Sequence, residues 1–500
     1  MGVIAKQSIR GTIVTYLGIA VGIFTTFFVL TRFLTTEEIG LKQVLIDNAA
    51  TLFISLAQLG TNASIIRFYP YFKEKDSDED HGFFFWALLV PFFGFLVFAV
   101  VYWACSTPIA AWFGEKSPLF VKYYYFVLPI SFFMLYQTIC ESTCNVLMRI
   151  VVPRGVRELG VRIGLLVVYL LYAKRILSLD GFVIALCANY AIASIVNLCY
   201  FLSLKHIKLR PDWAFLRANK SIVRRYLTYT GFLVISALTT VLAPILSSLF
   251  ITAEMGLNST GIFAIATYIA VMVSIPNRSV TAIASPQLAR AIKEQNREEC
   301  SLLIQQVTRN LLLIGGFILL AIWVNIDLIF HIMPNGETFA TAKIPALLLG
   351  VSQLILGTFY ICLNALNFSR YYAFSLLLSA ILTVSAILLN RYLVPQYQMT
   401  GAAASNLLSF ELYYLLICIT VVALCRLKIV DRNWWLIMIL IATVFVLNWL
   451  WMTYLPSFGI WTDSILRSIV LLGGACFLAY KMKLSPEING QLSKTLNLKP

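Results

Sequence analysis

Long, continuous apolar runs constrain this chain more than any other feature of its sequence. Fourteen stretches approach the roughly 20 apolar residues that a helix needs to cross a bilayer. Overall, 60% of the residues are apolar and 12% are charged, which excludes a soluble enzyme, a disordered chain and a secreted disulfide scaffold. A β-barrel would instead show short alternating strands. The pattern therefore predicts an all-α polytopic membrane protein, with spans near 11–33, 41–63, 83–105, 119–142, 155–173, 179–203, 227–251, 257–282, 306–328, 342–366, 371–390, 400–425, 434–453 and 463–480.

The distribution of basic residues predicts the orientation of these spans. With a cytoplasmic N-terminus, cytoplasmic segments hold 27 of the 38 Lys and Arg residues, the opposite side holds nine, and two lie inside spans. Because basic residues accumulate on the cytoplasmic side, and an even number of spans returns the chain to its starting side, both termini are predicted to be cytoplasmic. The net charge of +15 then reflects this asymmetry and contact with anionic membrane lipids, so no nucleic acid is expected as a partner.

The chain offers little material for metal or acid–base chemistry. Its ten cysteines lie singly in apolar runs, and it has only three histidines. Cysteine in an apolar run usually behaves as a small apolar side chain. We therefore expect no cofactor and no metal site.

Two charged stretches on the predicted cytoplasmic side are open to two interpretations. Residues 212–226 and 286–304 both place apolar side chains at helical spacing among charges. This spacing suits a helix that lies on the membrane surface, and an ordinary solvated connection explains it equally well.

Two parts of the sequence share a pattern. Gly40 and Arg67 are 27 residues apart near the start, and Gly261 and Arg290 are 29 residues apart near the middle. Internal duplication is frequent in transporters, which bind substrate between their repeats near the bilayer midplane. The predicted organisation is an N-terminal six-helix lobe, a basic cytoplasmic linker, a C-terminal six-helix lobe, and two further helices with a cytoplasmic tail. The corresponding ranges are 1–205, 206–225, 226–425 and 426–500.

The same segments resemble a known family, the Wzx-type polysaccharide flippases of the multidrug/oligosaccharidyl-lipid/polysaccharide exporter superfamily. The opening of those flippases is similar to Thr31-Arg32-Phe33-Leu34, Glu37-Glu38-Ile39-Gly40 and Ile65-Ile66-Arg67-Phe68. The start of their second lobe is similar to Gly261-Ile262-Phe263-Ala264-Ile265-Ala266 and Pro286-Gln287-Leu288-Ala289-Arg290. One departure lies late in the seventh helix, where the family often has an acidic residue and this chain has Leu246-Ser247-Ser248-Leu249.

The resemblance implies two six-helix lobes around a central cavity that opens alternately to each side of the membrane. It implies movement of a polyprenyl-pyrophosphate-linked oligosaccharide, such as an O-antigen, capsule or exopolysaccharide repeat unit, from the inner to the outer leaflet of the bacterial cytoplasmic membrane. It also implies polysaccharide polymerase and other envelope-assembly proteins as candidate partners. Fourteen spans favour this flippase branch over the drug exporters of the superfamily, which use sodium or protons.

Charged residues in or near the spans are the candidate substrate-binding residues, because an ionisable group deep in a span usually faces a cavity or a partner. Asp47 and Glu411 have no basic residue within one turn of their own helices, so we expect them to border the cavity, although an interhelical pair would also explain them. The others have simpler alternatives. Glu158 at i,i+4 would satisfy Arg162, and the membrane interface would accommodate Glu141, Arg278, Arg32 and Arg67.

Three of these residues suit a pyrophosphate in particular. Arg67, Arg162 and Arg278 lie in the predicted cytoplasmic halves of their helices, and the Arg fork matches phosphate oxygens. Arg67 and Arg278 close the second and eighth helices, so we expect them to approach one head group from the two lobes. The mechanism expected from the sequence is capture of the pyrophosphate by a cationic cavity.

Two other functions compete with the flippase. The first is a cation-coupled multidrug antiporter of the same superfamily. The second is a membrane enzyme of envelope polysaccharide assembly, which should present catalytic residues in a sizeable external loop. The longest external connections contain a single histidine, His331, and no cluster of catalytic residue types, so we expect no enzyme.

Overall fold

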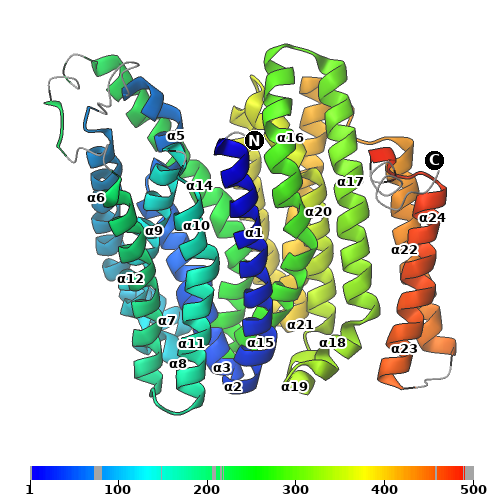
Figure 1. Ribbon diagram of the computed structural model, residues 1–500. Coiled ribbons are helices and arrows are strands. Elements are labelled where there is room, and N and C mark those ends of the chain that lie inside the picture. Colours follow the sequence, from blue (N-terminus) through cyan, green and yellow to red (C-terminus); the bar gives the residue numbers. More distant parts are fainter. Residues whose placement is uncertain are drawn as a thin grey trace. The chain divides into compact units, whose positions relative to one another are not determined.

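The computed structural model describes residues 3–72, 81–147, 149–204, 210–213, 217, 219–455, 459–487 and 489. All regular elements in these ranges are helices, as Figure 1 shows. The predicted all-α fold is therefore confirmed. By its internal contacts the chain divides into two compact units, Met1–Gly261 and Ile262–Pro500.

The first unit is built from helices that are repeatedly interrupted by short π-helical segments, labelled η1, η2 and η4. A π-helix is rare and usually occurs as a single widened turn within an α-helix, frequently at a functional site. The elements of this unit are α1 (Val3–Phe24), η1 (Thr25–Leu30), α2 (Thr31–Phe33), α3 (Thr36–Lys42), η2 (Gln43–Ala50), α4 (Thr51–Ala57), α5 (Thr61–Phe72), α6 (Phe83–Ala104), α7 (Ser106–Phe113), α8 (Pro118–Lys122), η3 (Tyr124–Phe126), α9 (Val127–Val146), α10 (Val151–Gly155), η4 (Val156–Gly160), α11 (Val161–Ala173), α12 (Leu179–Ser203) and α14 (Lys220–Met255).

An aromatic core holds part of this unit together. Phe68 and Phe72 from α5 pack in one cluster with Phe83 and Phe84 from α6. Phe201 of α12 belongs to the same cluster and meets the Phe84 ring edge to face. Aromatic side chains bury large areas and prefer tilted or edge-to-face contacts, and the rings of this cluster adopt such angles. The core therefore fixes α5 against the first turns of α6.

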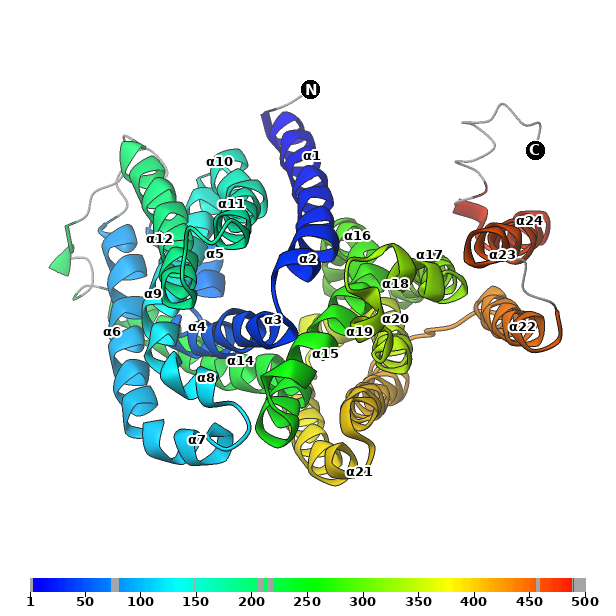
Figure 2. The same cartoon turned by 90° about the horizontal axis from the view of Figure 1, so that it is seen from below.

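The second unit begins within α15 (Leu257–Val271) and contains the last two candidate spans. Its core joins α17, α20 and α22, and Figure 2 shows α22 and α24 beside α17. The elements are η5 (Met272–Ser274), α16 (Ile275–Lys293), α17 (Arg297–Val324), α18 (Ile326–Ile332), α19 (Gly336–Ala340), α20 (Lys343–Phe368), α21 (Ala373–Thr420), η6 (Val421–Cys425), α22 (Arg432–Tyr454), α23 (Ile460–Arg467), η7 (Ser468–Gly473) and α24 (Gly474–Lys481).

Ten helical segments of the described chain are long and apolar enough to cross a membrane. One of them, Ala373–Cys425, contains two of the predicted spans. It breaks at Gln398, whose φ of 54° is not helical, and the chain folds back so closely that a Cβ on Gly401 would lie 2.1 Å from the Leu393 carbonyl oxygen. The predicted spans at 119–142 and 155–173 lie on helices that do not meet the same criterion, and within 227–251 the described part contributes the shorter apolar stretch Val241–Met255. The count of fourteen therefore stays a prediction.

The structure favours the second interpretation of the stretch at 286–304, a connection between helices. Its first part, up to Lys293, is the end of α16, and its second part, from Arg297, begins α17. Gln295 in the turn between them has a φ of 56°, and the Asn296 side chain caps α17 by accepting from the Glu299 N–H at 3.2 Å. The other stretch, 212–226, lies partly outside the described residues, and from Lys220 onward it is the start of α14.

The division by contacts differs from the predicted lobes. It falls after α14 because α14 packs against α4 and α5 of the first unit. The predicted boundaries at 205 and 226 stay predictions, as does the separation of a two-helix appendage at 426.

Candidate functional site

The segment that carries the first sequence motif begins a helix with a complete N-terminal cap. Thr35 caps α3 through a reciprocal pair of bonds. Its hydroxyl accepts from the Glu38 N–H at 3.3 Å, and its own N–H donates to the Glu38 carboxylate at 2.8 Å. The Tyr172 hydroxyl also donates to Glu38. This capping box explains why a Thr followed three residues later by Glu begins the helix.

Two glycines that the sequence pattern aligned, Gly40 and Gly261, pack against each other. A Cβ on Gly40 would lie 2.0 Å from the Leu257 carbonyl oxygen, and a Cβ on Gly261 would lie 1.9 Å from the Thr36 carbonyl oxygen. The contact is reciprocal, because each glycine approaches the residue four positions before the other. Only glycine permits two helices to come this close.

The π-helical segment η2 creates a polar cluster within a candidate span. Lys42 Nζ donates to Asp47 Oδ2 at 2.7 Å, and Gln43 Nε2 donates to Asn48 Oδ1 at 3.4 Å. Both pairs are i,i+5, the spacing at which the backbone bonds of a π-helix run. In a regular α-helix the side chains at this spacing point in different directions. Asp47 therefore has a basic partner on its own helical segment, five residues away and beyond the single turn over which it has no basic residue.

This cluster extends to other helices of the same unit. Asn48 Nδ2 donates to Ser248 Oγ of α14 at 2.7 Å, and both side chains are buried. Ser248 is one of the residues that stand where the resembled family often has a carboxylate. Tyr169 of α11 and Tyr190 of α12 lie near enough to Lys42 and Asp47 to interact with their charges. The result is an ion pair surrounded by hydroxyl and amide groups, with the Lys42 side chain 10% exposed and the Asp47 side chain 33% exposed.

A second cluster surrounds the π-helical segment η4. Arg157 donates to Glu141 at 2.8 Å and to Glu158 at 2.9 Å, and Arg162 donates to Glu158 at 3.1 Å and to the Gly18 carbonyl oxygen of α1. The predicted Glu158–Arg162 pair is confirmed. Glu141 is buried and ion-paired, so its interpretation as a solvated interfacial residue is wrong. Two guanidinium groups and two carboxylates balance, so the cluster as a whole is neutral.

The remaining candidates of the first unit are exposed arginines beside aromatic rings. Arg67 lies in α5, a separate helix that follows a turn with positive φ at Leu59 and Gly60. Its guanidinium carbon is 4.2 Å from the centre of the Tyr229 ring, a distance typical of a cation–π contact. Arg32 lies in α2, with its guanidinium carbon 5.6 Å from the centre of the Phe33 ring.

In the second unit, Arg278 and Glu411 are both exposed within candidate spans. Arg278 lies near the start of α16, which continues for fifteen residues to Lys293, so Arg278 does not close its helix as predicted. Glu411 lies in the second leg of α21. Neither side chain forms an ion pair with a residue in the described part of the second unit.

Sequence reasoning missed a buried arginine in α17. Arg309 donates to Asp431, the N-cap residue of α22, and to both carboxylate oxygens of Glu487 at 2.6 and 2.8 Å. This triad ties the start of α22 and the segment after α24 to α17. A buried arginine held by two carboxylate partners is better suited to a structural role than to substrate binding.

The described residues contain no group of three or more His, Cys, Asp or Glu side chains that could hold a metal ion. What these clusters offer chemically is fixed charge, hydrogen-bonding groups and aromatic faces inside candidate spans. Groups of these kinds bind phosphate and sugar hydroxyls.

Comparisons with known proteins identify a family and several structures with a similar fold. The profile of the polysaccharide biosynthesis protein family matches residues 8–292. The fold is similar to the lipid II flippase MurJ in an inward closed conformation, with 13% identity, a TM-score of 0.67, and coverage of 95% of this chain and 99% of that one. It is also similar to an inward-facing multidrug resistance MATE family transporter of the MOP superfamily, with 14% identity, a TM-score of 0.61, and coverage of 80% and 93%. A third similar structure is a MATE transporter from Vibrio cholerae, with 14% identity, a TM-score of 0.56, and coverage of 85% and 99%. Among proteins of curated function, none matches the sequence of this chain.

Proposed function

The chain belongs to the polysaccharide biosynthesis protein family, and from this membership we propose that it flips a polyprenyl-pyrophosphate-linked oligosaccharide across the membrane. The observation that carries the proposal is the family match over more than half of the chain, joined to a fold similar to that of a lipid II flippase over nearly its whole length. A transporter of this kind moves its cargo by alternating access and forms no covalent intermediate, so the proposed protein is not an enzyme.

We place the protein in the bacterial cytoplasmic membrane, with both termini in the cytoplasm. The asymmetry of basic residues supports this orientation. The cargo then comes from the inner leaflet, where its pyrophosphate meets the basic ends of the helices first. Polysaccharide polymerase and other envelope-assembly proteins are the proposed partners that would receive the product.

Arg67 and Arg278 are the proposed phosphate ligands. Both are exposed, and neither is held by a carboxylate in the described part of its own unit. Tyr229 beside Arg67 orients the guanidinium while leaving its N–H groups for phosphate. Arg32, exposed in α2, is a further candidate of the same kind.

Arg162 and Glu141 support the site in a different way. Arg162 already donates to Glu158 and to a backbone carbonyl, and Glu141 already accepts from Arg157. Opening this neutral cluster would expose two arginines and two carboxylates together. We propose that the cluster rearranges during transport and does not hold the cargo throughout.

Asp47 and Glu411 are the proposed polar contacts for the sugar or a coupling ion. Asp47 is partly exposed beside Lys42, and Glu411 is exposed on α21. A carboxylate accepts hydrogen bonds from sugar hydroxyls and also binds a proton or cation.

The test is reconstitution of the full-length protein in liposomes that contain a fluorescent polyprenyl-pyrophosphate-linked sugar. A membrane-impermeant reductant quenches the label in the outer leaflet, and a flippase exposes the inner-leaflet pool as well. We expect almost complete quenching with the protein and about half with the double variant Arg67→Ala/Arg278→Ala or with empty liposomes. If the labelled lipid of the inner leaflet stays protected in liposomes that contain the folded native protein, the proposal is overturned.

A second candidate function, cation-coupled multidrug export, is favoured by the similarity to MATE transporters. The same liposomes distinguish it if they are given a proton or sodium gradient and a cationic dye. Gradient-driven dye movement without lipid flipping would favour the antiporter.

A further inference from the structure

A pocket of about 730 Å³ lies in the first unit, away from the charged clusters on η2 and η4. Its walls come from the end of α5, the first two turns of α6 and the first turns of α14. The α6 residues that line it begin a candidate membrane span, Phe83–Ala104. The pocket therefore lies at the end of a candidate span, and if this helix crosses the membrane the pocket is at the level of the lipid head groups.

The inner wall of this pocket is apolar and aromatic. Phe72, Phe83 and Trp86 line it together with Val90 and Tyr226. The apolar area continues down α6 toward Val90, in the direction of the bilayer core. Such a wall suits an acyl chain, and Trp is enriched at this level of membrane proteins.

The rim of the pocket is basic. Arg217, Lys220 and Arg224 all line it, and all three are exposed. None of them forms an ion pair with another residue in the described part of the chain. Three cations that have no ion pair within the described residues, above an apolar wall, are complementary to a molecule with an anionic head and an apolar tail.

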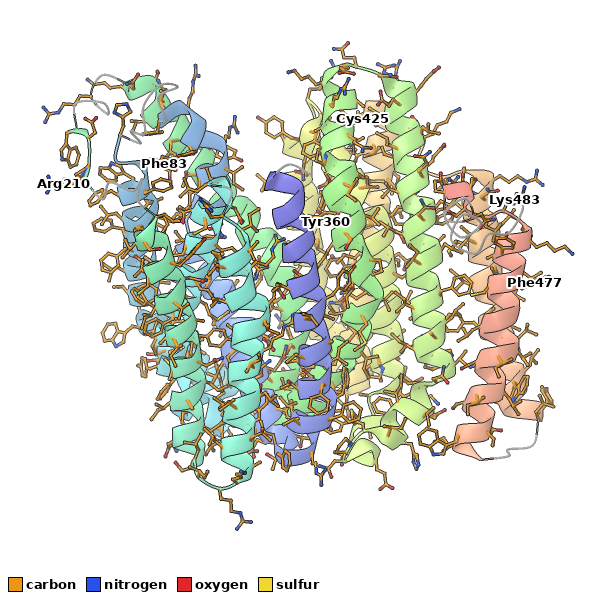
Figure 3. All side chains as sticks on the ribbon, in the orientation of Figure 1. Phe83, Arg210, Tyr360, Cys425, Phe477 and Lys483 are labelled. Carbon is orange, nitrogen blue, oxygen red and sulfur yellow. The ribbon has the colours of Figure 1, made fainter. Side chains whose placement is uncertain are left out.

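The segment that precedes this rim is fixed to the start of α6. His81 Nδ1 and Asp212 Oδ2 are 2.9 Å apart, and the Trp86 and Trp213 rings meet edge to face with centres 5.4 Å apart. Gly82, with a φ of 71°, leaves room for the Arg210 carbonyl oxygen, which would lie 2.3 Å from a Cβ at that position. Figure 3 shows Phe83 and Arg210 at the same end of the unit. These contacts hold a surface segment against a span, so the pocket is formed by the fold.

We propose that this pocket binds an anionic glycerophospholipid, with its phosphate on Arg217, Lys220 and Arg224 and one acyl chain along the wall of α6. The bound lipid would offset part of the positive charge of the rim and fasten the start of α14 to α6. This site is independent of the proposed flippase activity, because it uses none of the residues assigned to the cargo.

The test is native mass spectrometry of the full-length protein in nonionic detergent with equimolar dioleoyl phosphatidylglycerol and dioleoyl phosphatidylcholine. We expect selective retention of one phosphatidylglycerol. The triple variant R217Q/K220Q/R224Q should lose it, because each basic residue near an anionic lipid contributes a factor of about five in affinity. The matched control is R432Q/K481Q/K483Q, which removes three exposed basic residues of the second unit and should retain the lipid.

A second variant tests the contribution of the apolar wall independently of the basic rim. Val90→Trp fills the wall and leaves the rim intact, so it should also reduce retention about ten-fold if an acyl chain lies there. Inorganic phosphate at 100-fold excess should not displace the lipid, because phosphate lacks the tail.

Three results would overturn the proposal. Displacement by free phosphate would identify a simple anion site. Equal retention of the two lipids would show no head-group selectivity. Equal retention by the native protein and the triple variant would show that the rim does not hold the head group, as expected if the five acidic residues between Phe72 and His81 already neutralise it.

Discussion

Lys42 Nζ donates to Asp47 Oδ2 at 2.7 Å, across five residues of one continuous helical segment. The pair exists because α3 widens into the π-helical segment η2, which places i and i+5 side chains together. In a regular α-helix the Lys42 side chain would point in a different direction from Asp47. The π-helical turn brings the two together, so Lys42 neutralises the Asp47 carboxylate inside the candidate span.

This pair predicts an asymmetry between single and double substitutions. Asp47→Asn or Lys42→Met alone should lower the free energy of unfolding by about 1–3 kcal/mol, less than for a fully buried pair because Asp47 is partly exposed. The double variant Lys42→Met/Asp47→Asn should recover most of that loss, because no charge is left without its partner. Thermal unfolding of the purified protein measures both. A double variant that is less stable than either single variant would show that the pair is not the source of the effect.

The close approach of Gly40 and Gly261 predicts intolerance of even one methyl group. Gly40→Ala or Gly261→Ala would place a Cβ about 2 Å from a backbone carbonyl oxygen, so the two helices must separate. We expect a loss of about 2–4 kcal/mol in stability, as for severe overpacking, and reduced transport. The matched control is Gly231→Ala in α14, where a Cβ would meet nothing within 4 Å. If Gly40→Ala and Gly261→Ala both melted at the temperature of the native protein, the prediction would be contradicted.

The Arg309 triad predicts sensitivity to acid. Burial raises the pKa of Glu487, but a backbone N–H and the Arg309 guanidinium lower it by more, so the pKa lies below the ordinary 4.5. Because the folded pKa is the lower one, the stabilisation from Glu487 is present above pH 4.5 and is lost as the pH falls through the folded pKa. Thermal unfolding between pH 3 and 7 should show this loss in the native protein and a smaller one in Glu487→Gln. Identical pH profiles would rule out this contribution.

The proposed phosphate ligands predict a distinction between charge and geometry. Arg67→Ala and Arg278→Ala should each weaken cargo binding about ten- to a hundred-fold, because a charged hydrogen bond to phosphate contributes roughly 1.5–3 kcal/mol. Lys should restore only part of the loss, because it lacks the guanidinium fork. Complementation of a flippase-null strain, at matched membrane levels, measures the export. Arg290→Ala is the control, since Arg290 is exposed and pairs with Glu294. Normal export by both alanine variants would exclude these arginines from the site.

The basic residues predict the topology. A reporter fused after Arg217 should lie in the cytoplasm, and one fused after Gly459 should lie on the opposite side. The opposite result at either position would overturn the fourteen-span arrangement.

Much of the chain could be predicted from its apolar runs. Most residues of the predicted spans lie in helices, because a segment of about 20 apolar residues buried in lipid must satisfy its own backbone hydrogen bonds. The Glu158–Arg162 pair was also predictable, since it needs only the i,i+4 spacing of one helix.

The contacts of the polar residues were not predictable in the same way. The Lys42–Asp47 pair depends on a change of helical register, and the burial of Glu141 depends on Arg157, sixteen residues away. The Arg309 triad joins residues more than a hundred positions apart.

The sequence by itself therefore determined the class of fold and the helical character of the apolar runs, whereas the number of spans and their orientation stay predictions. Each of these depends on the transfer of local side chains between water and lipid, which composition specifies. Only the tertiary structure decided which charges are paired and which stay exposed. An ion pair needs two atoms within a few ångströms, and their approach is set by π-helical turns and by the packing of helices that are distant in the chain.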